Sequence, residues 1–569
     1  MSKTAITSPQ NLQQQLQRNW QQHLQNWFSQ GWLLMVAAIA LILSLPTLAV
    51  LSSIFSNQAE TWDHLAATVL PAYVGNSLSL MAGVSGGVLI IGVGTAWLVT
   101  KCRFPGDRLF EWALLLPLAA PTYILAYAYT DLLDVSGVVQ TSLRKAFDWQ
   151  VGDYWFPDIR SLPGAIALLS LTLYPYVYLL ARVAFLEQSA GVLEASRLLG
   201  CSPWRSFWQI SLPLARPAIV AGLSLALMET LNDFGTVEYF GVSTFTTGIY
   251  RTWFGLGEPV AAAQLAACLL LFILWLILGE RWSRRQVKFY QTSSYYSLPS
   301  YELRGWRGGL AMFACAVPII FGLLIPAGDL GLMTLRSPDQ ILGNQFWNFA
   351  TNSFTLATIT ALIALGLGLV IAYGVRLANT APIRFASQIT ALGYAVPGSV
   401  IAVGTLIPLG WVDNTIDTWF RDNWQISTGL LFSGTIFALV FGYLVRFLAV
   451  SLGGITTSLE KIKPNLDNAA RSLGHQPLAI LGKVHMPLLW SSLMTAGILV
   501  FVDVMKELPA TIILRPFNFN TLAVRVYNLA SDERLSEAAS SALAIVLVGL
   551  IPVLILTWQI RNSRSLPKV

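Results

Sequence analysis

Long runs of apolar residues alternate with short polar segments along this chain. Runs such as 32–55 and 259–279 carry no charge and reach the roughly 20 residues that a helix needs to cross ~30 Å of hydrocarbon. The strands of a membrane β-barrel would instead alternate apolar and polar residues. The pattern therefore predicts an all-α membrane protein.

Twelve spanning segments are expected, at 32–55, 74–100, 110–133, 162–181, 214–235, 259–279, 308–328, 350–375, 386–411, 427–450, 486–506 and 538–560. The first run is too long for the apolar core of a signal peptide, and no small-residue cleavage site follows it, so we expect it to remain as a span. Before it, Leu and Trp residues recur at nearly helical spacing among glutamines. This spacing predicts an interfacial helix on the membrane surface, and the alternative is an irregular polar tail.

Composition and charge agree with this class. The chain is 55% hydrophobic and 11% charged, whereas soluble domains carry roughly 25% charged residues. With the N-terminus inside, most of the 35 Lys and Arg residues fall in cytoplasmic segments, as the positive-inside rule requires. Both termini are therefore expected in the cytoplasm, and the net charge of +6 needs no nucleic-acid partner.

Motifs for bound cofactors are missing from the sequence. The four Cys and four His residues are scattered, and no HExxH or CxxC motif is present to hold a metal. No GxxxxGK[ST] phosphate loop is found either. We expect no cofactor on this chain, so that any ATP it depends on is bound by another subunit.

The two halves of the chain repeat each other. Gly200, Pro203 and Pro213 each have a counterpart 274 residues later. The same offset aligns the segment 228–236 with the segment 502–510. Pro121 and Pro397 match at an offset of 276. Since each half has six spans, we expect parallel repeats about a pseudo-two-fold axis along the membrane normal. The expected organisation is a first repeat at 1–288 that includes the N-terminal interfacial helix, a cytoplasmic linker at 289–307 and a second repeat at 308–569.

A polar segment in each half predicts a cytoplasmic helix–turn–helix. Gly200 suits the left-handed end of a helix, Ser202 an N-cap and Pro203 the first position of a second helix. Trp204, Phe207 and Trp208 would then share one aromatic face, with Pro213 and Pro217 marking a break before the next span. An exposed apolar face marks an interaction site or lies on lipid headgroups. Its recurrence in both halves favours a two-fold repeated partner.

These residues resemble the EAA loop of bacterial ABC importer permeases, EAA-x3-G-x9-I-x-LP. The second half fits with Asn468 in place of the glutamate, so docking there is expected to depend less on charge. The resemblance implies the type I permease fold, two ATPase subunits docked on the two loops and a periplasmic binding protein. The residues that it assigns to ATPase docking are Glu194, Ala195, Ser196, Gly200, Trp204, Phe207, Ile210, Pro213, Asn468, Ala469, Ala470, Gly474, Leu478, Leu481, Val484 and Pro487.

The fused double form, with METLNDFGTVEYFGV in one half and VDVMKELPATIILRPFNFNTLAVRVY in the other, resembles the permeases of ferric-iron importers. This resemblance implies a non-enzymatic inner-membrane subunit for iron(III) import, with ATP hydrolysed by partner subunits. Thiamine and phosphonate permeases look similar and remain alternatives. A secondary transporter is a further alternative, although it has no need of paired EAA loops. A membrane enzyme would require a catalytic constellation that the sequence lacks.

Charged residues within the fifth span of each half are candidates for the translocation pathway. Glu229 and Asp233 are four residues apart on one helix face, and in register they meet Asp503 and Glu507, with Lys506 aligned to Asn232. Charges inside spans are costly and usually face a cavity or a partner, and iron(III) prefers oxygen ligands. The alternative is a structural network in which Lys506 pairs with Asp503 and the first two acids bond to backbone near Gly235.

Overall fold

The computed structural model describes residues 9–56, 59–188, 196, 198–285, 301–336, 343–378 and 380–564. Helices dominate this part of the chain, and its one sheet is a parallel pair, β1 (Cys102–Arg103) with β2 (Tyr301–Glu302). Eleven helices are long and apolar enough to cross a membrane, or up to twelve if one bent pair counts as a span. The predicted all-α membrane class is confirmed.

The chain forms two compact units, and each draws on separated stretches of sequence. The smaller unit contains Met1–Leu45, Ile359–Tyr394 and Tyr443–Phe501, and the larger contains Pro46–Thr358, Ala395–Gly442 and Val502–Val569. The repeat boundaries expected at 288 and 308 stay a prediction, since these units follow packing rather than sequence order.

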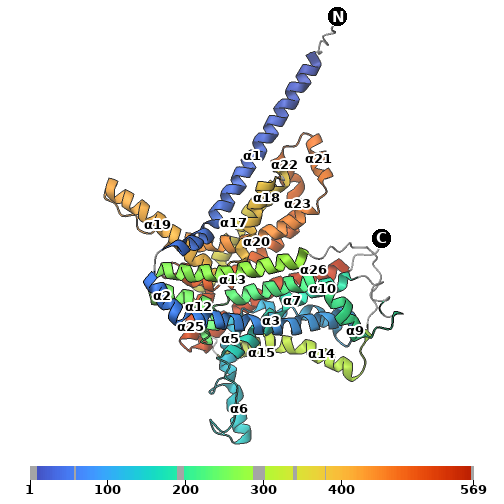
Figure 1. Cartoon of the computed structure of the whole chain (residues 1–569), viewed down its shortest axis with the longest axis vertical. Helices are drawn as coiled ribbons and strands as arrows, with labels where there is room; N and C mark the ends of the chain where they lie inside the picture. Colours follow the sequence, from blue (N-terminus) through green and yellow to red (C-terminus); the bar gives the residue numbers. More distant parts are fainter. Residues whose placement is uncertain are drawn as a thin grey trace. The chain divides into compact units, whose positions relative to one another are not determined.

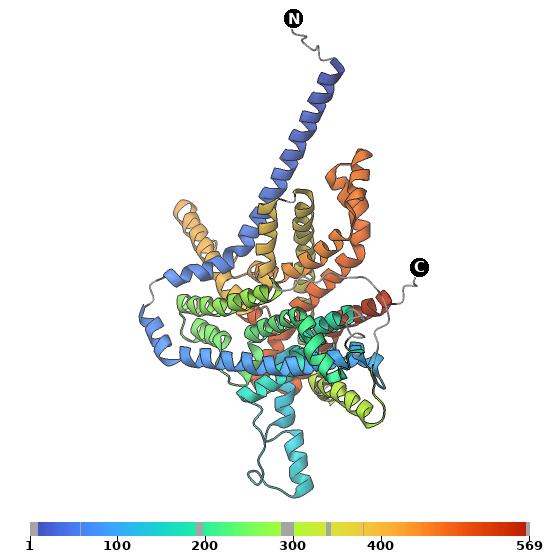
Figure 2. The ribbon, with the colours of Figure 1, turned by 45° about the vertical axis from the view of Figure 1, so that its right-hand side comes forward.

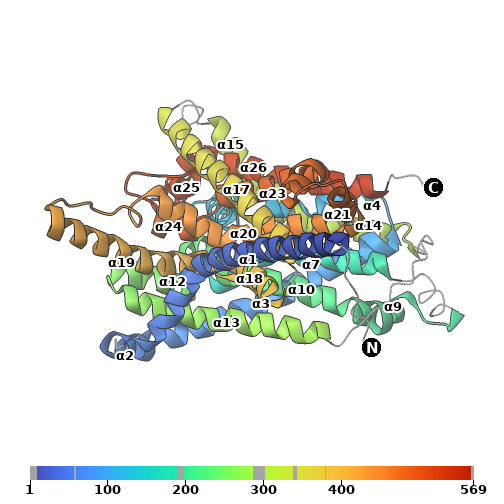
Figure 3. The same cartoon turned by 90° about the horizontal axis from the view of Figure 1, so that it is seen from above.

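The larger unit is built around α3, α7 and α10, which pack along one another (Figures 1 and 2). Gly87 and Gly92 of α3 allow this approach, because a Cβ at Gly92 would meet Val177 and the backbone of α7. α15 lies against α26 on another side of this unit (Figure 3). Its helices are α2 (Ala59–Thr68), α3 (Leu70–Lys101), α4 (Asp107–Ala113), α5 (Thr122–Leu133), α6 (Val138–Phe147), α7 (Leu162–Glu187), α9 (Pro203–Ser206), α10 (Leu212–Asn232), α11 (Gly235–Tyr239), α12 (Phe245–Tyr250), α13 (Pro259–Arg285), α14 (Trp306–Ile319), α15 (Ile325–Arg336), α19 (Gly398–Trp424), α24 (Pro509–Leu514), α25 (Leu522–Ser531) and α26 (Leu535–Arg564).

The smaller unit contains α18, α21 and α22 and parts of four long helices that continue into the larger unit. Tyr373 is central to it, with its ring against both Trp32 and His485. Its helices are α1 (Pro9–Ser52), α17 (Asn344–Ala378), α18 (Ala381–Ala391), α20 (Ile436–Glu460), α21 (Pro464–Ser472), α22 (Pro477–Ile480) and α23 (Met486–Met505).

Two predicted spans, 110–133 and 386–411, are broken rather than continuous. The first turns by 90° between Ala119 and Thr122, and the second stops with α18 and resumes with α19 at Gly398. Pro121 and Pro397 stand at the matching N-caps, with φ/ψ of −58°/140° and −57°/145°. Proline disfavours the helical conformation of the residue before it and cannot donate to the preceding turn. The prolines that match in sequence therefore produce matching breaks.

The predicted span 427–450 begins later, at Ile436. Asp413, which is fully buried, accepts hydrogen bonds from the backbone nitrogens of Leu431, Phe432 and Ser433. These bonds hold the residues before Ile436 as a loop, because a carboxylate that satisfies three successive N–H groups competes with helical pairing.

The segment before the first span is helical, as its spacing predicts. It continues without interruption into the span as part of α1, so it is an extension of that helix rather than a separate one. Its expected position on the membrane surface stays a prediction.

Candidate functional site

The glycine turn predicted in each docking loop is present. Gly200 has φ +79° and Gly474 has φ +81°, both in the left-handed region. Apart from the chain neighbours, no atom of the described residues lies within 4 Å of a Cβ built on either glycine. The two positions therefore favour glycine through backbone conformation alone.

The helix after the first turn starts as the sequence predicts. The Oγ of Ser202 accepts a hydrogen bond from the backbone nitrogen of Arg205 at 3.3 Å, and Pro203 is the first residue of α9. In the second loop Gln476 occupies the N-cap without a side-chain bond, and Pro477 begins α22.

The predicted break at Pro213 and Pro217 is wrong. In both halves a π-helical turn joins the short helix to the span, η3 (Phe207–Ser211) before α10 and η7 (Leu481–His485) before α23. The nitrogens of Leu212 and Met486 bond to carbonyls five residues back. In an ordinary α-helix the ring of Pro213 or Pro487 would clash with the carbonyl four residues earlier. Here that carbonyl lies within the π turn, whose wider backbone makes room for the ring. The helix therefore continues through the proline.

The predicted aromatic face is divided between surface and core. Trp204 and Trp208 are 68% and 52% exposed, whereas Phe207 is 8% exposed and packs against Trp97 at 4.9 Å between ring centroids. The three rings do contact one another. Phe207 is therefore an anchor that faces inward, and the surface available to a partner is the pair of tryptophans.

The remaining docking residues differ in burial. Glu194 and Ala195 lie outside the described residues. Ser196 and Ala470, which are equivalent in the repeat, are both buried, and Ser196 bonds to the Oγ of Ser206 at 3.1 Å. The motif needs a small residue at that position because the side chain faces inward. The structure leaves Ile210, Leu481 and Val484 half-buried. It exposes Pro213, Asn468, Ala469, Leu478 and Pro487.

An ion network that sequence reasoning missed holds the second loop. Asp467 pairs with Arg376 at 2.8 Å and with His485 at 2.7 Å, and Arg376 also donates to the carbonyls of Leu459 and Ile462. Burial by itself would raise the pKa of Asp467, but the hydrogen bonds and charge of Arg376 and His485 outweigh it and hold that pKa below its ordinary value. The signal in the sequence was an acid immediately before Asn468.

The fifth span of each half ends at a carboxylate that caps the next short helix. Asp233 is buried and accepts hydrogen bonds from the backbone nitrogens of Thr236 and Val237 and from the hydroxyls of Thr122 and Thr236. Glu507, its counterpart 274 residues later, accepts from the nitrogen of Ala510 at 3.1 Å. Both carboxylates thus satisfy N–H groups that a helix start leaves without partners.

The two helix ends meet in the larger unit, and we name this region the central break. Gly235 packs against Leu508 and Tyr123. The side-chain oxygen of Asn232 accepts a hydrogen bond from the nitrogen of Gly398, the first residue of α19, at 2.8 Å. The central break therefore joins elements from both halves of the sequence, as the matched register predicts.

The other candidate pathway charges have local contacts. Lys506 pairs with Asp503 at 2.8 Å, and Asn232 approaches the carboxylate of Glu229 at 3.5 Å. The pairing of Lys506 with Asp503 is the one in the structural-network alternative, whereas the contact of Glu229 is with a side chain and not with backbone near Gly235. Within the described residues, no group of three or more His, Cys, Asp or Glu side chains is arranged to hold a metal ion. A role in translocation stays a prediction.

Comparison with known proteins identifies the class. Residues 88–288 match the family described as binding-protein-dependent transport system inner membrane component. This stretch is a transport permease domain. The chain is 26% identical over 545 residues to the Fe(3+)-transport system permease protein FbpB 2 of Haemophilus influenzae, covering 92% of this chain and 97% of that protein. It is 24% identical over 548 residues to the ferric transport system permease protein FbpB of Actinobacillus pleuropneumoniae, covering 92% and 77%.

A shorter relative clarifies the architecture. The sulfate transport system permease protein CysT of Escherichia coli is 29% identical over 262 residues, which is 44% of this chain and 91% of that protein. One such permease therefore corresponds to about half of this chain. The predicted resemblance to fused ABC importer permeases is confirmed, and a binding-protein-dependent inner-membrane component works with an ATPase and a periplasmic binding protein.

Proposed function

We propose that this permease forms the membrane pathway of an ATP-driven importer for iron(III). The observation that supports iron(III) as the substrate is the similarity to two ferric permeases over 92% of the chain. The acids near the central break support a cationic cargo, because a hard trivalent cation prefers oxygen ligands whereas an anion would be repelled. These candidate pathway residues are Glu229, Asp233, Asp503 and Glu507, with Lys506 as the accompanying base.

Two copies of an ATPase are proposed to dock on the two EAA loops, one on each. The support is the matched geometry of the loops, with a left-handed glycine and a π turn in both. The chain itself is proposed to bind no cofactor, with ATP held by the partner subunits and both termini in the cytoplasm. Native mass spectrometry of the purified assembly should give one copy of this chain with two ATPase copies. A homodimer of this chain with a single ATPase would contradict the proposal.

Oxyanion import is a second candidate. It is favoured by the CysT similarity and by 31% identity over 152 residues to the molybdenum transport system permease protein ModB of Escherichia coli. The central acids weigh against it, because an anion would need compensating positive charge.

Transport in proteoliposomes separates the two candidates. The assembly of permease, ATPase and binding protein is reconstituted with ATP inside, and uptake of radioactive iron(III) citrate, sulfate and molybdate is measured. We expect ATP-dependent uptake of iron only. Uptake of sulfate or molybdate without iron would overturn the iron assignment and retain the importer.

A further inference from the structure

Tyr127 of α5 has a buried hydroxyl to which the described residues offer no hydrogen-bond partner. The residue is 2% exposed. A buried polar group in this state costs about 1–3 kcal/mol. Such a group requires an explanation beyond packing.

Other phenols surround this hydroxyl. The ring of Tyr127 lies 5.8 Å from that of Tyr123 and 4.5 Å from that of Tyr239. The ring of Tyr527 lies 5.9 Å from that of Phe234, the residue after Asp233. We call the four residues Tyr123, Tyr127, Tyr239 and Tyr527 the tyrosine cluster. It brings together α5, α11 and α25 beside the central break.

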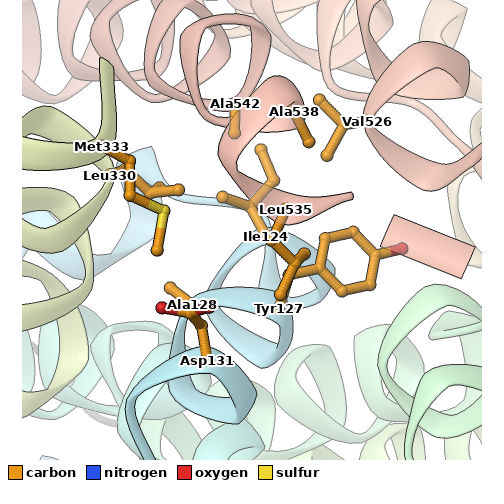
Figure 4. Close-up of a pocket in the computed structure, with 10 residues that line it drawn as sticks. All are labelled: Ile124, Tyr127, Ala128, Asp131, Leu330, Met333, Val526, Leu535, Ala538 and Ala542. Atoms are coloured by element: carbon orange, nitrogen blue, oxygen red, sulfur yellow. The ribbon is translucent and has the colours of Figure 1, made fainter. Parts of the chain in front are cut away.

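The hydroxyl of Tyr127 does not serve the neighbouring pocket. That cavity, lined by Tyr127, Asp131 and eight apolar residues, has a volume of about 10 Å³, close to the minimum for one water molecule. Figure 4 shows the Tyr127 hydroxyl directed away from Asp131 and from the other lining residues. The cavity is also far too small for a transported solute.

The tyrosine cluster runs from the protein interior to accessible surface. Tyr123 and Tyr127 are buried, whereas Tyr239 and Tyr527 are half-buried. At this rim Arg160 stacks on the ring of Tyr239 at 5.0 Å and donates to its hydroxyl at 3.4 Å. Burial outweighs the guanidinium and keeps the pKa of Tyr239 above its ordinary value. The half-buried rim gives the cluster a route for exchanging protons with water.

We propose that the tyrosine cluster binds iron(III) in transit, an inference that rests on the proposed function. A phenol that binds releases its proton to water at the rim, and its oxygen donates an electron pair to the ion, whose oxidation state does not change. Phenolate is a hard oxygen donor suited to this cation. Asp233, which accepts four hydrogen bonds and donates none, adds negative charge beside the site.

Visible absorption tests the site independently of transport, because phenolate bound to iron(III) gives a charge-transfer band. Iron(III) citrate is added to the purified full assembly, and gallium(III) citrate, which forms no such band, serves as competitor. We expect a band that gallium removes. Tyr127→Phe should weaken the band and lower iron uptake by about tenfold, equivalent to ~1.4 kcal/mol.

Tyr174→Phe is the matched control. Tyr174 of α7 is also fully buried, with a hydroxyl that lacks a hydrogen-bond partner among the described residues, but it lies outside the tyrosine cluster. The band and uptake should not change in this variant. If Tyr127→Phe melts below wild type, Tyr239→Phe at the rim replaces it with the same two expected results.

The outcomes distinguish the site from the proposed function. Iron uptake that persists in a stable Tyr127→Phe variant, or a band that this substitution does not weaken, overturns the site and leaves iron import standing. A wild-type assembly that imports sulfate but not iron overturns the proposed function.

Discussion

The two docking loops share a geometry but differ in what holds them. In the first loop Phe207 packs against Trp97, and Gln188 donates to the carbonyl of Ser211 at 2.8 Å. In the second loop Tyr373, the counterpart of Trp97, donates to the carbonyl of Pro477 at 2.5 Å, and Asp467 pairs with Arg376 and His485. The first anchor is largely aromatic and neutral, and the second is ionic.

One element of the anchor is common to both loops. Lys101 at the end of α3 donates to the carbonyl of Phe185 at 2.7 Å, and Arg376 near the end of α17 donates to that of Leu459, 274 residues after Phe185. A basic side chain, buried in the first half and half-buried in the second, thus satisfies the same helix end. The comparison teaches that the repeat preserves backbone geometry and the satisfied helix ends, while the side chains that pack on them have diverged.

The largest expected effect comes from removing the ionic anchor. Arg376→Met leaves Asp467 without its strongest partner and two carbonyls without a donor. The two side chains are 15% and 13% exposed, so we expect a loss between the about 0–1 kcal/mol of a surface pair and the about 3–5 kcal/mol of a fully buried pair. The melting temperature of the purified assembly should fall by several degrees. Arg103→Met is the control, because Arg103 pairs with Asp107 on the surface, where a pair contributes about 0–1 kcal/mol. Equal melting of the two variants would show that the network does not anchor the loop.

Valine at either glycine turn should have the next largest effect. Gly200→Val and Gly474→Val place a β-branched residue at positive φ, which costs roughly 1–2 kcal/mol or more. We expect normal membrane insertion, loss of import and loss of ATPase co-purification. Gly200→Asn and Gly474→Asn should retain most of the docking, because Asn tolerates this conformation. Valine variants that import normally would contradict the predicted role of the turn.

A smaller effect is expected from the exposed side chains at equivalent loop positions. Trp204→Ala should weaken ATPase binding by about tenfold, because aromatic residues dominate interface energies, and Leu478→Ala should weaken it less. Binding of each variant to the isolated ATPase is measured by surface plasmon resonance. Leu310→Ala, on an exposed face of α14, is the control. No loss for Trp204→Ala would assign the tryptophan pair to lipid headgroups instead.

The smallest effect concerns acid stability. Because the folded pKa of Asp467 lies below its ordinary value, its stabilising contribution is fully present above the unfolded pKa of about 3.9 and is lost as pH falls through the folded value. The melting temperature of wild type should therefore decline more steeply in acid than that of Asp467→Asn. Parallel pH profiles would contradict this contribution.

Features set by single residues could be predicted from the sequence. The left-handed turns follow from Gly200 and Gly474, the N-cap from Ser202, and the paired breaks coincide with prolines that the register had already matched. The breaks themselves were missed because both predicted spans are predominantly apolar on each side of the proline, and hydropathy does not report a change of helix direction.

Features that depend on tertiary contacts could not be predicted. Phe207 faces inward because Trp97, far earlier in the sequence, provides its packing surface. Arg376, one of the two partners of Asp467, lies on α17, and nothing local to the loop indicates it. For the candidate pathway, the pairing of Lys506 with Asp503 follows from their spacing, whereas the capping role of Asp233 depends on where α10 ends.

The π turns have a consequence for how force passes from a loop to the membrane. A π turn contains about one residue more than the α turn it replaces, so it rotates the preceding helix by roughly 100° relative to the following one. Each loop and its span are nevertheless one continuous helical rod, from Trp204 to Asn232 and from Pro477 to Met505. A push on the first loop, which lies in the same unit as the central break, would pass along this rod as tilt or twist, in a direction that depends on the rotation at the π turn.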